Sequence, residues 1–289
     1  MRWRAGYFGP EGTYTQEALL ADTVGLELET VPLPTIYDTV MAVHEGAVDQ
    51  ALVPIENSLE GSVNATLDAL AMETDDVAIV GEVVHPIRHC LIARTPLELS
   101  EIETLVSHPQ ANAQCARFIR ARLPGARVLA GSSTADAVRT VAGQAGPWAA
   151  LGNRIAAEHY GCVVLRAGVE DVADNETRFV WLARAGAAAG GPRVAVGHAA
   201  ALGPWKTAIV FWGLGSEAPG WLVACLAEFA QRGVNLTRIE SRPRKQGLGR
   251  YMFFVDLEGR EDEPHVAAGL AGLGARVERL RVLGSFPSA

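Results

Sequence analysis

The 289-residue chain carries a formal net charge of -8, has a pI near 5.4 and contains no block of lysine and arginine, which argues against nucleic-acid binding. Its apolar runs are far shorter than the roughly 20 residues that a membrane span needs, and its first residues lead into a strand rather than a signal peptide. With 49% apolar and 20% charged residues, the composition is typical of a folded cytoplasmic protein with two or three domains.

The first predicted unit is a strand over Arg4–Phe8, a turn over Gly9–Thr15 and a helix over Gln16–Asp22. The turn would present backbone N–H groups and the hydroxyls of Thr13 and Thr15 above the sheet, where they suit an anion. A plain turn with a threonine helix cap explains the same pattern. The spacing of a dinucleotide-binding turn, G-x-G-x-x-G, is absent.

Polar residues also stand where a second buried strand ends. The remaining predicted elements of this first lobe are helices over Thr35–Glu45 and Gly61–Met72 and strands over Gln50–Ile55 and Val77–Val84. Glu56, Asn57 and Ser58 directly follow the strand that ends at Ile55. Glu56 is either a catalytic acid or a helix cap and salt-bridge partner.

The segment His85–Ala93 leads into a further strand and indicates a crossover into a second lobe. The predicted elements of that lobe are strands over Glu103–Val106, Arg127–Ala130 and Trp148–Leu151 and helices over Ala111–Leu123 and Ala135–Gln144. Polar groups again follow strands, at Ser107-His108-Pro109-Gln110 and Ser132-Ser133-Thr134. Such groups from two lobes suit a small polyanion held between them, as in two-lobed periplasmic-type binding folds, although helix capping is the other role open to each.

The stretch Asn175-Glu176-Thr177-Arg178-Phe179 precedes an apolar run and predicts a strand end that carries chemistry. Thr177 can donate a proton or a hydrogen bond, Arg178 can hold a carboxylate through two parallel hydrogen bonds, and Phe179 can exclude water. A polar strand start with a solvated arginine is the alternative interpretation.

The cysteine pattern indicates neither a metal site nor a disulfide framework. Four cysteines are scattered without a CxxC pair or a histidine at metal-ligand spacing, namely Cys90, Cys115, Cys162 and Cys225. We expect reduced, buried thiols and no metal.

Residues 185–204 are rich in alanine and glycine without an apolar period and predict a linker. Beyond it, strands are predicted over Lys206–Trp212, Leu236–Ser241, Tyr251–Leu257 and Arg276–Val282, and helices over Trp221–Gln231 and Pro264–Leu273. This βαββαβ order indicates a ferredoxin-like domain over residues 205–285, a fold often used to sense small ligands.

Taken together, these strings resemble the prephenate dehydratase family of phenylalanine biosynthesis. The motifs that carry the resemblance, in the family's order, are Gly9-Pro10-Glu11-Gly12-Thr13-Tyr14-Thr15, Pro54-Ile55-Glu56-Asn57-Ser58, His108-Pro109-Gln110 with Gln114-Cys115, Ser133-Thr134-Ala135, Asn175–Phe179 and Glu240-Ser241-Arg242-Pro243. The C-terminal unit is similar to the family's ACT regulatory domain.

The resemblance implies an α/β catalytic domain over residues 1–184, with two lobes around a cleft, followed by an ACT domain. Prephenate would be the substrate, phenylpyruvate the product and phenylalanine the effector, with no cofactor, in a homodimer or homotetramer. Because the chain opens directly on the first dehydratase strand, we expect no chorismate mutase activity.

By residue, the resemblance places catalysis on Thr177, Arg178 and Phe179. The residues that it assigns to substrate binding are Thr13, Glu56, Asn57, Ser58, Ser107, His108, Gln110, Gln114, Ser133 and Thr134. Those that it assigns to effector binding are Pro219, Gly220, Leu222, Asn235, Leu236, Glu240, Ser241, Arg242 and Pro243. Trp221 stands where the family's motif has alanine, so its side chain either points away from the effector site or fills part of it.

The sequence leaves several alternatives open. A threonine hydroxyl is a poor acid, so Glu56 and His108 are both candidates for the ultimate proton source. Arogenate dehydratase and a nonaromatising prephenate decarboxylase are rival activities, although Thr177 and Arg178 favour dehydration. A noncatalytic two-lobed protein that binds a small anion is the rival from another class.

Overall fold

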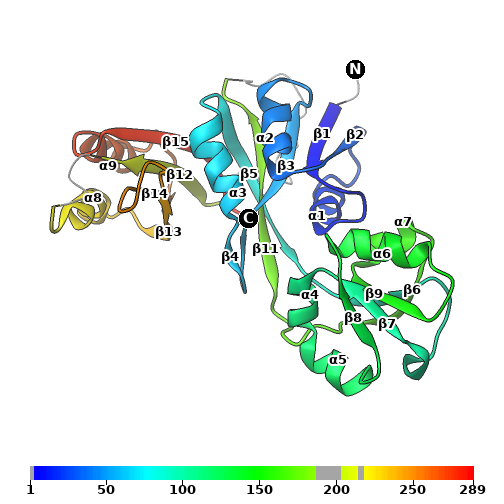
Figure 1. The fold of residues 1–289 in the computed structure, drawn as a ribbon. Helices are drawn as coiled ribbons and strands as arrows, with labels where there is room; N and C mark the ends of the chain where they lie inside the picture. The colour runs from blue at the N-terminus through cyan, green and yellow to red at the C-terminus, as the bar shows by residue number, and fades with distance from the viewer. Residues whose placement is uncertain (1–2, 187–202, 214–217) are drawn as a thin grey trace.

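The computed structural model describes residues 3–186, 203–213 and 218–289, which form two α/β lobes and a C-terminal domain (Figure 1). The sheet of the first lobe has the strand order β2-β1-β3-β11-β5, with β4 paired to β3. Its elements are β1 (Trp3–Phe8), α1 (Tyr14–Asp22), β2 (Leu28–Leu33), α2 (Ile36–His44), β3 (Gln50–Asn57), β4 (Gly61–Ser62), α3 (Asn64–Asp68), the π turn η1 (Ala69–Glu73), β5 (Val77–Pro86) and β11 (Glu176–Arg184). Strand β11 runs antiparallel to both of its neighbours, β3 and β5.

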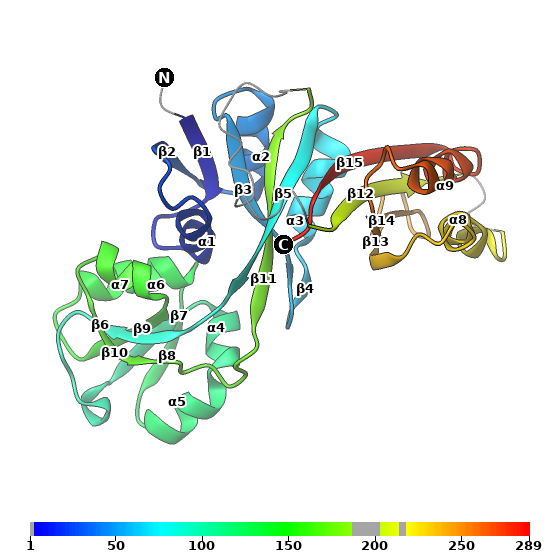
Figure 2. The ribbon, with the colours of Figure 1, turned by 180° about the vertical axis from the view of Figure 1, so that it is seen from behind.

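The long strands β5 and β11 connect the first lobe to the second, as Figure 2 shows from behind. Its sheet has the order β10-β6-β9-β7-β8. Its elements are β6 (Cys90–Ala93), the 3-10 turn η2 (Leu99–Glu101), β7 (Thr104–Ser107), α4 (Pro109–Gln114), α5 (Ala116–Arg122), β8 (Arg127–Ala130), α6 (Thr134–Ala142), β9 (Trp148–Gly152), α7 (Arg154–His159) and β10 (Val163–Ala167). The two-lobed α/β architecture predicted from the sequence is confirmed.

Two of the predicted helices are divided in the structure. The one predicted over Ala111–Leu123 breaks at Cys115, because the Asp171 carboxylate accepts hydrogen bonds from the backbone N–H groups of Arg117 and Phe118 and so caps a new helix. The one predicted over Gly61–Met72 begins as β4, whose residues pair with β3 and therefore cannot be helical. Strands β2 and β10 and helix α7 were not predicted.

The C-terminal domain has the predicted βαββαβ order. Its elements are β12 (Trp205–Trp212), α8 (Trp221–Ala230), β13 (Leu236–Pro243), β14 (Tyr251–Glu258), α9 (Pro264–Gly274) and β15 (Arg279–Pro287), with the strand order β13-β14-β12-β15. Both helices pack on one face of the sheet around Phe211, Phe229 and Val255. Most of the linker predicted over residues 185–204 lies outside the described residues.

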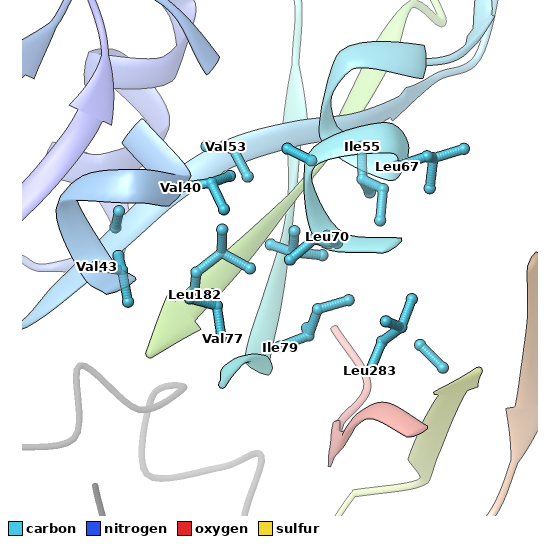
Figure 3. Close-up of a cluster of buried hydrophobic side chains, with 14 of the residues drawn as sticks. Val40, Val43, Val53, Ile55, Leu67, Leu70, Val77, Ile79, Leu182 and Leu283 are labelled. Atoms are coloured by element: carbon cyan, nitrogen blue, oxygen red, sulfur yellow. The ribbon is translucent and has the colours of Figure 1, made fainter. Parts of the chain in front are cut away.

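The other face of the C-terminal sheet shares a core with the first lobe. Figure 3 shows Leu283 of β15 near Ile79 of β5, in one cluster of buried apolar side chains that also contains Met252 and Phe254 of β14. At Gly284 the two backbones approach so closely that a Cβ atom would lie 2.0 Å from the Ile79 carbonyl oxygen. The C-terminal domain is therefore docked directly on the lobe that contains β11.

Candidate active site

A cavity of about 310 Å³ lies between the two lobes and is lined by residues from both. The predicted site residues that line it are Thr13, Asn57, His108, Gln110, Gln114, Ser133, Thr134, Thr177 and Phe179. Lining residues outside the predicted set are Phe8, Tyr14, Thr15, Pro54, Val63, Ile87, His89, Ala111, Ser132 and Asn175. A volume of this size suits a small ligand rather than a polymer.

Three helices begin at the wall of this cavity. The side chains of Thr13, His108 and Ser133 cap α1, α4 and α6 by accepting hydrogen bonds from backbone N–H groups of the first turns. The polar residues that follow β1, β7 and β8 are thus both helix caps and cavity residues. Because helix N-termini carry partial positive charge, the cavity favours an anionic ligand.

Asn57 and Thr177 form a pair at the ends of β3 and β11. The two residues lie opposite each other in the ladder, and the Asn57 amide nitrogen is 2.9 Å from Thr177 Oγ1. The same nitrogen is 2.7 Å from Asn175 Oδ1 and 3.0 Å from the Glu176 carbonyl, so three acceptors share its two hydrogens. Asn57 Oδ1 accepts hydrogen bonds from the backbone N–H groups of Leu59 and Glu60. These bonds fix the amide orientation, so Thr177 Oγ1 accepts a hydrogen bond and its own hydrogen stays available to a ligand.

A chain of hydrogen bonds continues from this pair into the second lobe. Asn175 donates to Gln114 Oε1 at 3.1 Å, Gln114 Oε1 lies 2.9 Å from His89 Nε2, and His89 Nδ1 lies 2.7 Å from the Tyr14 hydroxyl. Burial lowers the pKa of His89, and this effect outweighs the hydrogen bond to Gln114 and the charge of Glu170, which both raise it. The net lowering favours the neutral ring. A neutral ring accepts from Tyr14 and donates to Gln114, an assignment made from the hydrogen bonds.

Arg178 points away from the cavity. Side chains alternate along a strand, so Thr177 and Phe179 face the cavity while Arg178 faces the C-terminal domain. The Arg178 guanidinium lies 2.6 Å from Asp256 of β14, 3.5 Å from Glu82 and 3.6 Å from Glu56. Burial alone would lower the pKa of Arg178, but the Asp256 and Glu82 carboxylates outweigh it and raise that pKa.

Three further residues assigned to substrate binding do not line the cavity. Glu56 follows the same alternation as Arg178 and pairs with it at 3.6 Å. The Ser58 hydroxyl accepts a hydrogen bond from the backbone N–H of Glu176 at 3.0 Å, and Ser107 is fully buried and donates to the Leu151 carbonyl. Neighbouring side chains of a strand point to opposite faces of the sheet. This alternation, applied to β3 and β11, would have predicted that Glu56 and Arg178 lie on the face opposite Asn57 and Thr177.

The residues assigned to effector binding lie at two places in the C-terminal domain. Pro219 and Gly220 are exposed and Leu222 half-buried at the start of α8, and the others follow from Asn235 along β13. Glu240 accepts a hydrogen bond from Ser62 of the first lobe at 3.0 Å, and Arg242 pairs with Asp68 at 3.0 Å. Ser241 and Pro243 point to the opposite, exposed side.

The Trp221 side chain is held within its own domain. Its indole N–H donates to the Arg276 carbonyl at 3.2 Å, and its ring centroid lies 6.2 Å from that of Phe211 and 6.0 Å from that of Phe253. The side chain therefore packs against the core between the sheet and α8.

Neither a metal cluster nor a membrane helix is found in the described part of the chain. Over residues 3–186, 203–213 and 218–289, no three histidine, cysteine or acidic side chains gather as metal ligands, and no helix is long and apolar enough to cross a membrane. All four cysteines are free, and burial raises the pKa of the Cys115 thiol to about 12.

Comparisons with known proteins give one consistent family. The family model for prephenate dehydratase matches residues 5–187, and the ACT domain model matches residues 218–274. A prephenate dehydratase from Amycolatopsis methanolica is 41% identical over 287 residues, which is 99% of this chain and 89% of the relative.

Solved structures also match over nearly the whole chain, two of them with a TM-score of 0.84. A prephenate dehydratase from Arthrobacter aurescens in complex with L-Phe is 36% identical with a TM-score of 0.84, covering 98% of this chain and 89% of that one. The structure of GqqA, described as a novel type of quorum quenching acylase, is 29% identical with a TM-score of 0.84, covering 99% of this chain and 98% of that one. Because the family model matches residues 5–187 and a relative matches nearly the full length, the chain belongs to the prephenate dehydratase family and carries the family's C-terminal ACT domain.

Proposed function

We propose that the chain converts prephenate to phenylpyruvate, with loss of CO₂ and water. The ring carboxylate leaves as CO₂, the electron pair of the broken carbon–carbon bond moves into the ring, and the ring hydroxyl departs at the opposite carbon. That hydroxyl needs a proton to leave as water. Since aromatisation drives the reaction, the protein has to orient the dianion and to protonate the leaving group.

The observation that carries this proposal is the Asn57–Thr177 pair at the cavity wall. Asn57 donates to Thr177 Oγ1 at 2.9 Å, so the Thr177 hydrogen is free to bond to the departing hydroxyl. The same donation stabilises negative charge that develops on Oγ1 as the proton moves away. Thr177 is 7% exposed, and this burial strengthens the interaction.

His108 is the better candidate for the ultimate proton source. It lines the cavity, whereas Glu56 lies on the other face of the sheet. His108 Nδ1 accepts a hydrogen bond from the backbone N–H of Gln110, which leaves the ring hydrogen of the neutral form on Nε2. A neutral ring cannot give up its one ring hydrogen, so His108 must first take up a second proton from solvent; we propose that it then passes one proton through a water to Thr177 Oγ1 and returns to the neutral form.

Substrate carboxylates are held without a cationic side chain in this proposal. Among the described residues that line the cavity there is no lysine or arginine. Donors to the carboxylates are the backbone N–H groups in the first turns of α1 and α6 and the hydroxyls of Ser133 and Thr134. The hydroxyls of Thr13 and Ser132 already donate within the protein, to the Phe8 carbonyl and the Asp136 carboxylate. Phe179, only 2% exposed, supplies an apolar wall beside the ring.

A turnover assay tests the function directly. Purified protein is mixed with prephenate, and with arogenate in a parallel reaction; phenylpyruvate formed from prephenate is followed by absorbance, and phenylalanine formed from arogenate is measured by chromatography. We expect turnover of prephenate. Failure with prephenate combined with turnover of arogenate would identify the arogenate dehydratase activity, and failure with both would support the binding protein.

The description of GqqA suggests acyl transfer as a second activity for this fold. Acyl transfer needs a nucleophile activated by a base. Both histidines of the cavity already have other partners, His89 with Tyr14 and Gln114, and His108 with a backbone N–H. We therefore do not propose this activity for the chain.

We also propose that phenylalanine regulates the chain through the ACT domain. The Arthrobacter aurescens relative was solved with L-Phe, which supports an amino-acid effector. The start of α8 and the start of β13 would hold it, through Pro219, Gly220, Leu222, Asn235 and Leu236. Calorimetric titration with phenylalanine tests this, and a chain that binds none contradicts it.

A dimer through the ACT sheets is the assembly that we propose. Strand β13 is at an edge of its sheet, and its residues Thr237, Ile239, Ser241 and Pro243 are exposed. An open edge of this kind pairs readily with a second copy. Light scattering would separate dimer from tetramer, and a monomer at micromolar concentration would contradict the proposal.

A further inference from the structure

Six charged side chains gather where the C-terminal domain meets the catalytic strands, and we call them the interdomain charge cluster. Glu56, Glu82 and Arg178 come from the first lobe. Lys206, Arg238 and Asp256 come from the C-terminal sheet. Three positive and three negative charges balance, and Glu82 and Asp256 have side chains only 0% and 3% exposed.

Arg178 is the centre of the cluster. Its guanidinium bonds to Asp256 at 2.6 Å, and Asp256 belongs to the C-terminal domain while Arg178 belongs to the catalytic strand β11. Glu82 is shared in the same way, since its carboxylate lies 2.7 Å from Lys206 Nζ and 3.5 Å from Arg178. Two carboxylates thus tie this strand and its neighbour β5 to the C-terminal sheet.

The cluster is one residue away from the cavity at two places in the chain, and a contact of the cluster is next to the cavity at a third. Cavity residue Thr177 precedes Arg178, and cavity residue Asn57 follows Glu56. Val63 of the cavity follows Ser62, whose hydroxyl accepts from Arg238 at 2.9 Å. The same backbone segments therefore contact the C-terminal sheet on one face and the ligand cavity on the other.

The hydrogen bonding of the cluster is incomplete. Buried atoms without a hydrogen-bond partner include Glu82 Oε2, Arg178 Nε and Arg238 Nε, all three in the cluster. Glu56 Oε2 lies 3.6 Å from Arg178 Nε and 3.7 Å from Arg238 Nε, just beyond hydrogen-bond length. Because buried charges left partly unbonded are costly, Arg178 depends on the bonds that the C-terminal sheet does supply, above all the one to Asp256 at 2.6 Å.

We propose that Asp256 of the ACT domain is a positioning residue for the dehydration step. Asp256 holds Arg178 on the face of the sheet opposite the cavity. Through the backbone of β11, this contact fixes the position of the neighbouring Thr177 hydroxyl and of its partner Asn57. This inference rests on the proposed function, and it makes the docked C-terminal domain part of the catalytic site even without an effector. Misplacement of a reacting group by about 1 Å costs on the order of a hundredfold in rate.

The test compares two variants in the full-length protein. Asp256→Asn removes the charge that holds Arg178. Asp75→Asn is the control, because Asp75 also pairs across the domain boundary, with Arg279 at 3.1 Å, but is 80% exposed and is far along the chain from the cavity residues. We expect Asp256→Asn to lower kcat about tenfold or more with KM within about twofold, and Asp75→Asn to change neither by more than about twofold.

A merely structural role would give a different result. Loss of folded protein in Asp256→Asn would lower the apparent kcat in proportion to the active fraction, so that fraction is measured by titrating prephenate binding. A normal kcat per active site in Asp256→Asn would overturn the inference, and so would an equal loss in the control. Asp256→Glu, which restores the carboxylate, should recover part of the rate.

If Asp256→Asn does not fold, Ser62→Ala decides. It removes only the hydroxyl that contacts Arg238 and Glu240, and we expect a severalfold lower kcat with KM retained. A kcat within about 1.5-fold of wild type would contradict the inference. Turnover of prephenate by the wild type tests the proposed function, and the ratio of variant kcat to wild-type kcat tests this inference. The inference can therefore fail while the proposed function holds. A wild type without turnover overturns both.

Discussion

Replacement of Arg178 by methionine should destabilise the protein far more than removal of a comparable arginine at its surface. Arg178 is 12% exposed and its guanidinium neutralises Asp256 at 2.6 Å and Glu82 at 3.5 Å. Methionine keeps much of the side-chain volume and removes the charge. The cluster then holds three carboxylates against two cations, and Asp256 keeps only Arg238, at 4.0 Å.

The magnitude follows from burial. Removing one partner of a buried ion pair typically costs about 3–5 kcal/mol, because the remaining charge stays uncompensated. Arg279 offers a matched control: it also pairs across the domain boundary, but it is 53% exposed and its partner Asp75 is 80% exposed. An exposed pair contributes about 0–1 kcal/mol, so Arg279→Met should have little effect.

Urea unfolding followed by tryptophan fluorescence measures both variants. We expect the first unfolding transition of Arg178→Met to move to clearly lower urea, with a free-energy loss of about 3–5 kcal/mol, and that of Arg279→Met to stay near wild type. Equal shifts for the two variants would refute the view that Arg178 is part of a buried interdomain cluster. An Arg178 variant with normal stability but weakened prephenate binding would instead show that Arg178 contacts the substrate.

Three further predictions concern other parts of the molecule. Asn57→Ala removes the donor to Thr177 and should lower kcat about 10²-fold with a smaller change in KM, measured by steady-state kinetics. Burial lowers the pKa of His89 from 6.5, so just below pH 6.5 the unfolded chain binds a proton that the folded chain does not. The free energy of unfolding should therefore fall as the pH drops below 6.5, and this fall should be smaller in His89→Gln. Trp221→Ala should cost the C-terminal domain about 2 kcal/mol in thermal unfolding, because the indole packs inside that domain, while phenylalanine binding by calorimetry stays within about threefold; a larger loss of affinity would place Trp221 in the effector pocket.

Much of the fold follows from the sequence because its signals are local. Runs such as Gln50–Ile55 and Lys206–Trp212 are apolar enough to be recognised as buried strands, and caps such as Thr13 and Ser133 mark helix starts. The break at Cys115 is not visible in this way, because the carboxylate that causes it comes from Asp171, far along the chain.

The site was predicted less completely, for two physical reasons. Motif residues were assigned to one site as a block, although alternation along a strand sends Arg178 to the face opposite Thr177. Cavity residue His89 stands in an ordinary sequence context, and only the packing of the two lobes brings it against Tyr14 of the predicted turn. His89 lies between His85-Pro86 and an apolar strand, and its spacing from other polar residues does not match any catalytic or metal-binding motif.

The most direct test of the account is the rate of Thr177→Val with prephenate. Valine keeps the shape of threonine and removes only the hydroxyl that Asn57 contacts at 2.9 Å. If that hydroxyl donates to the leaving group, kcat should fall by about 10²–10⁴-fold while prephenate still binds. A valine variant with wild-type kcat would show that Thr177 takes no part in the dehydration.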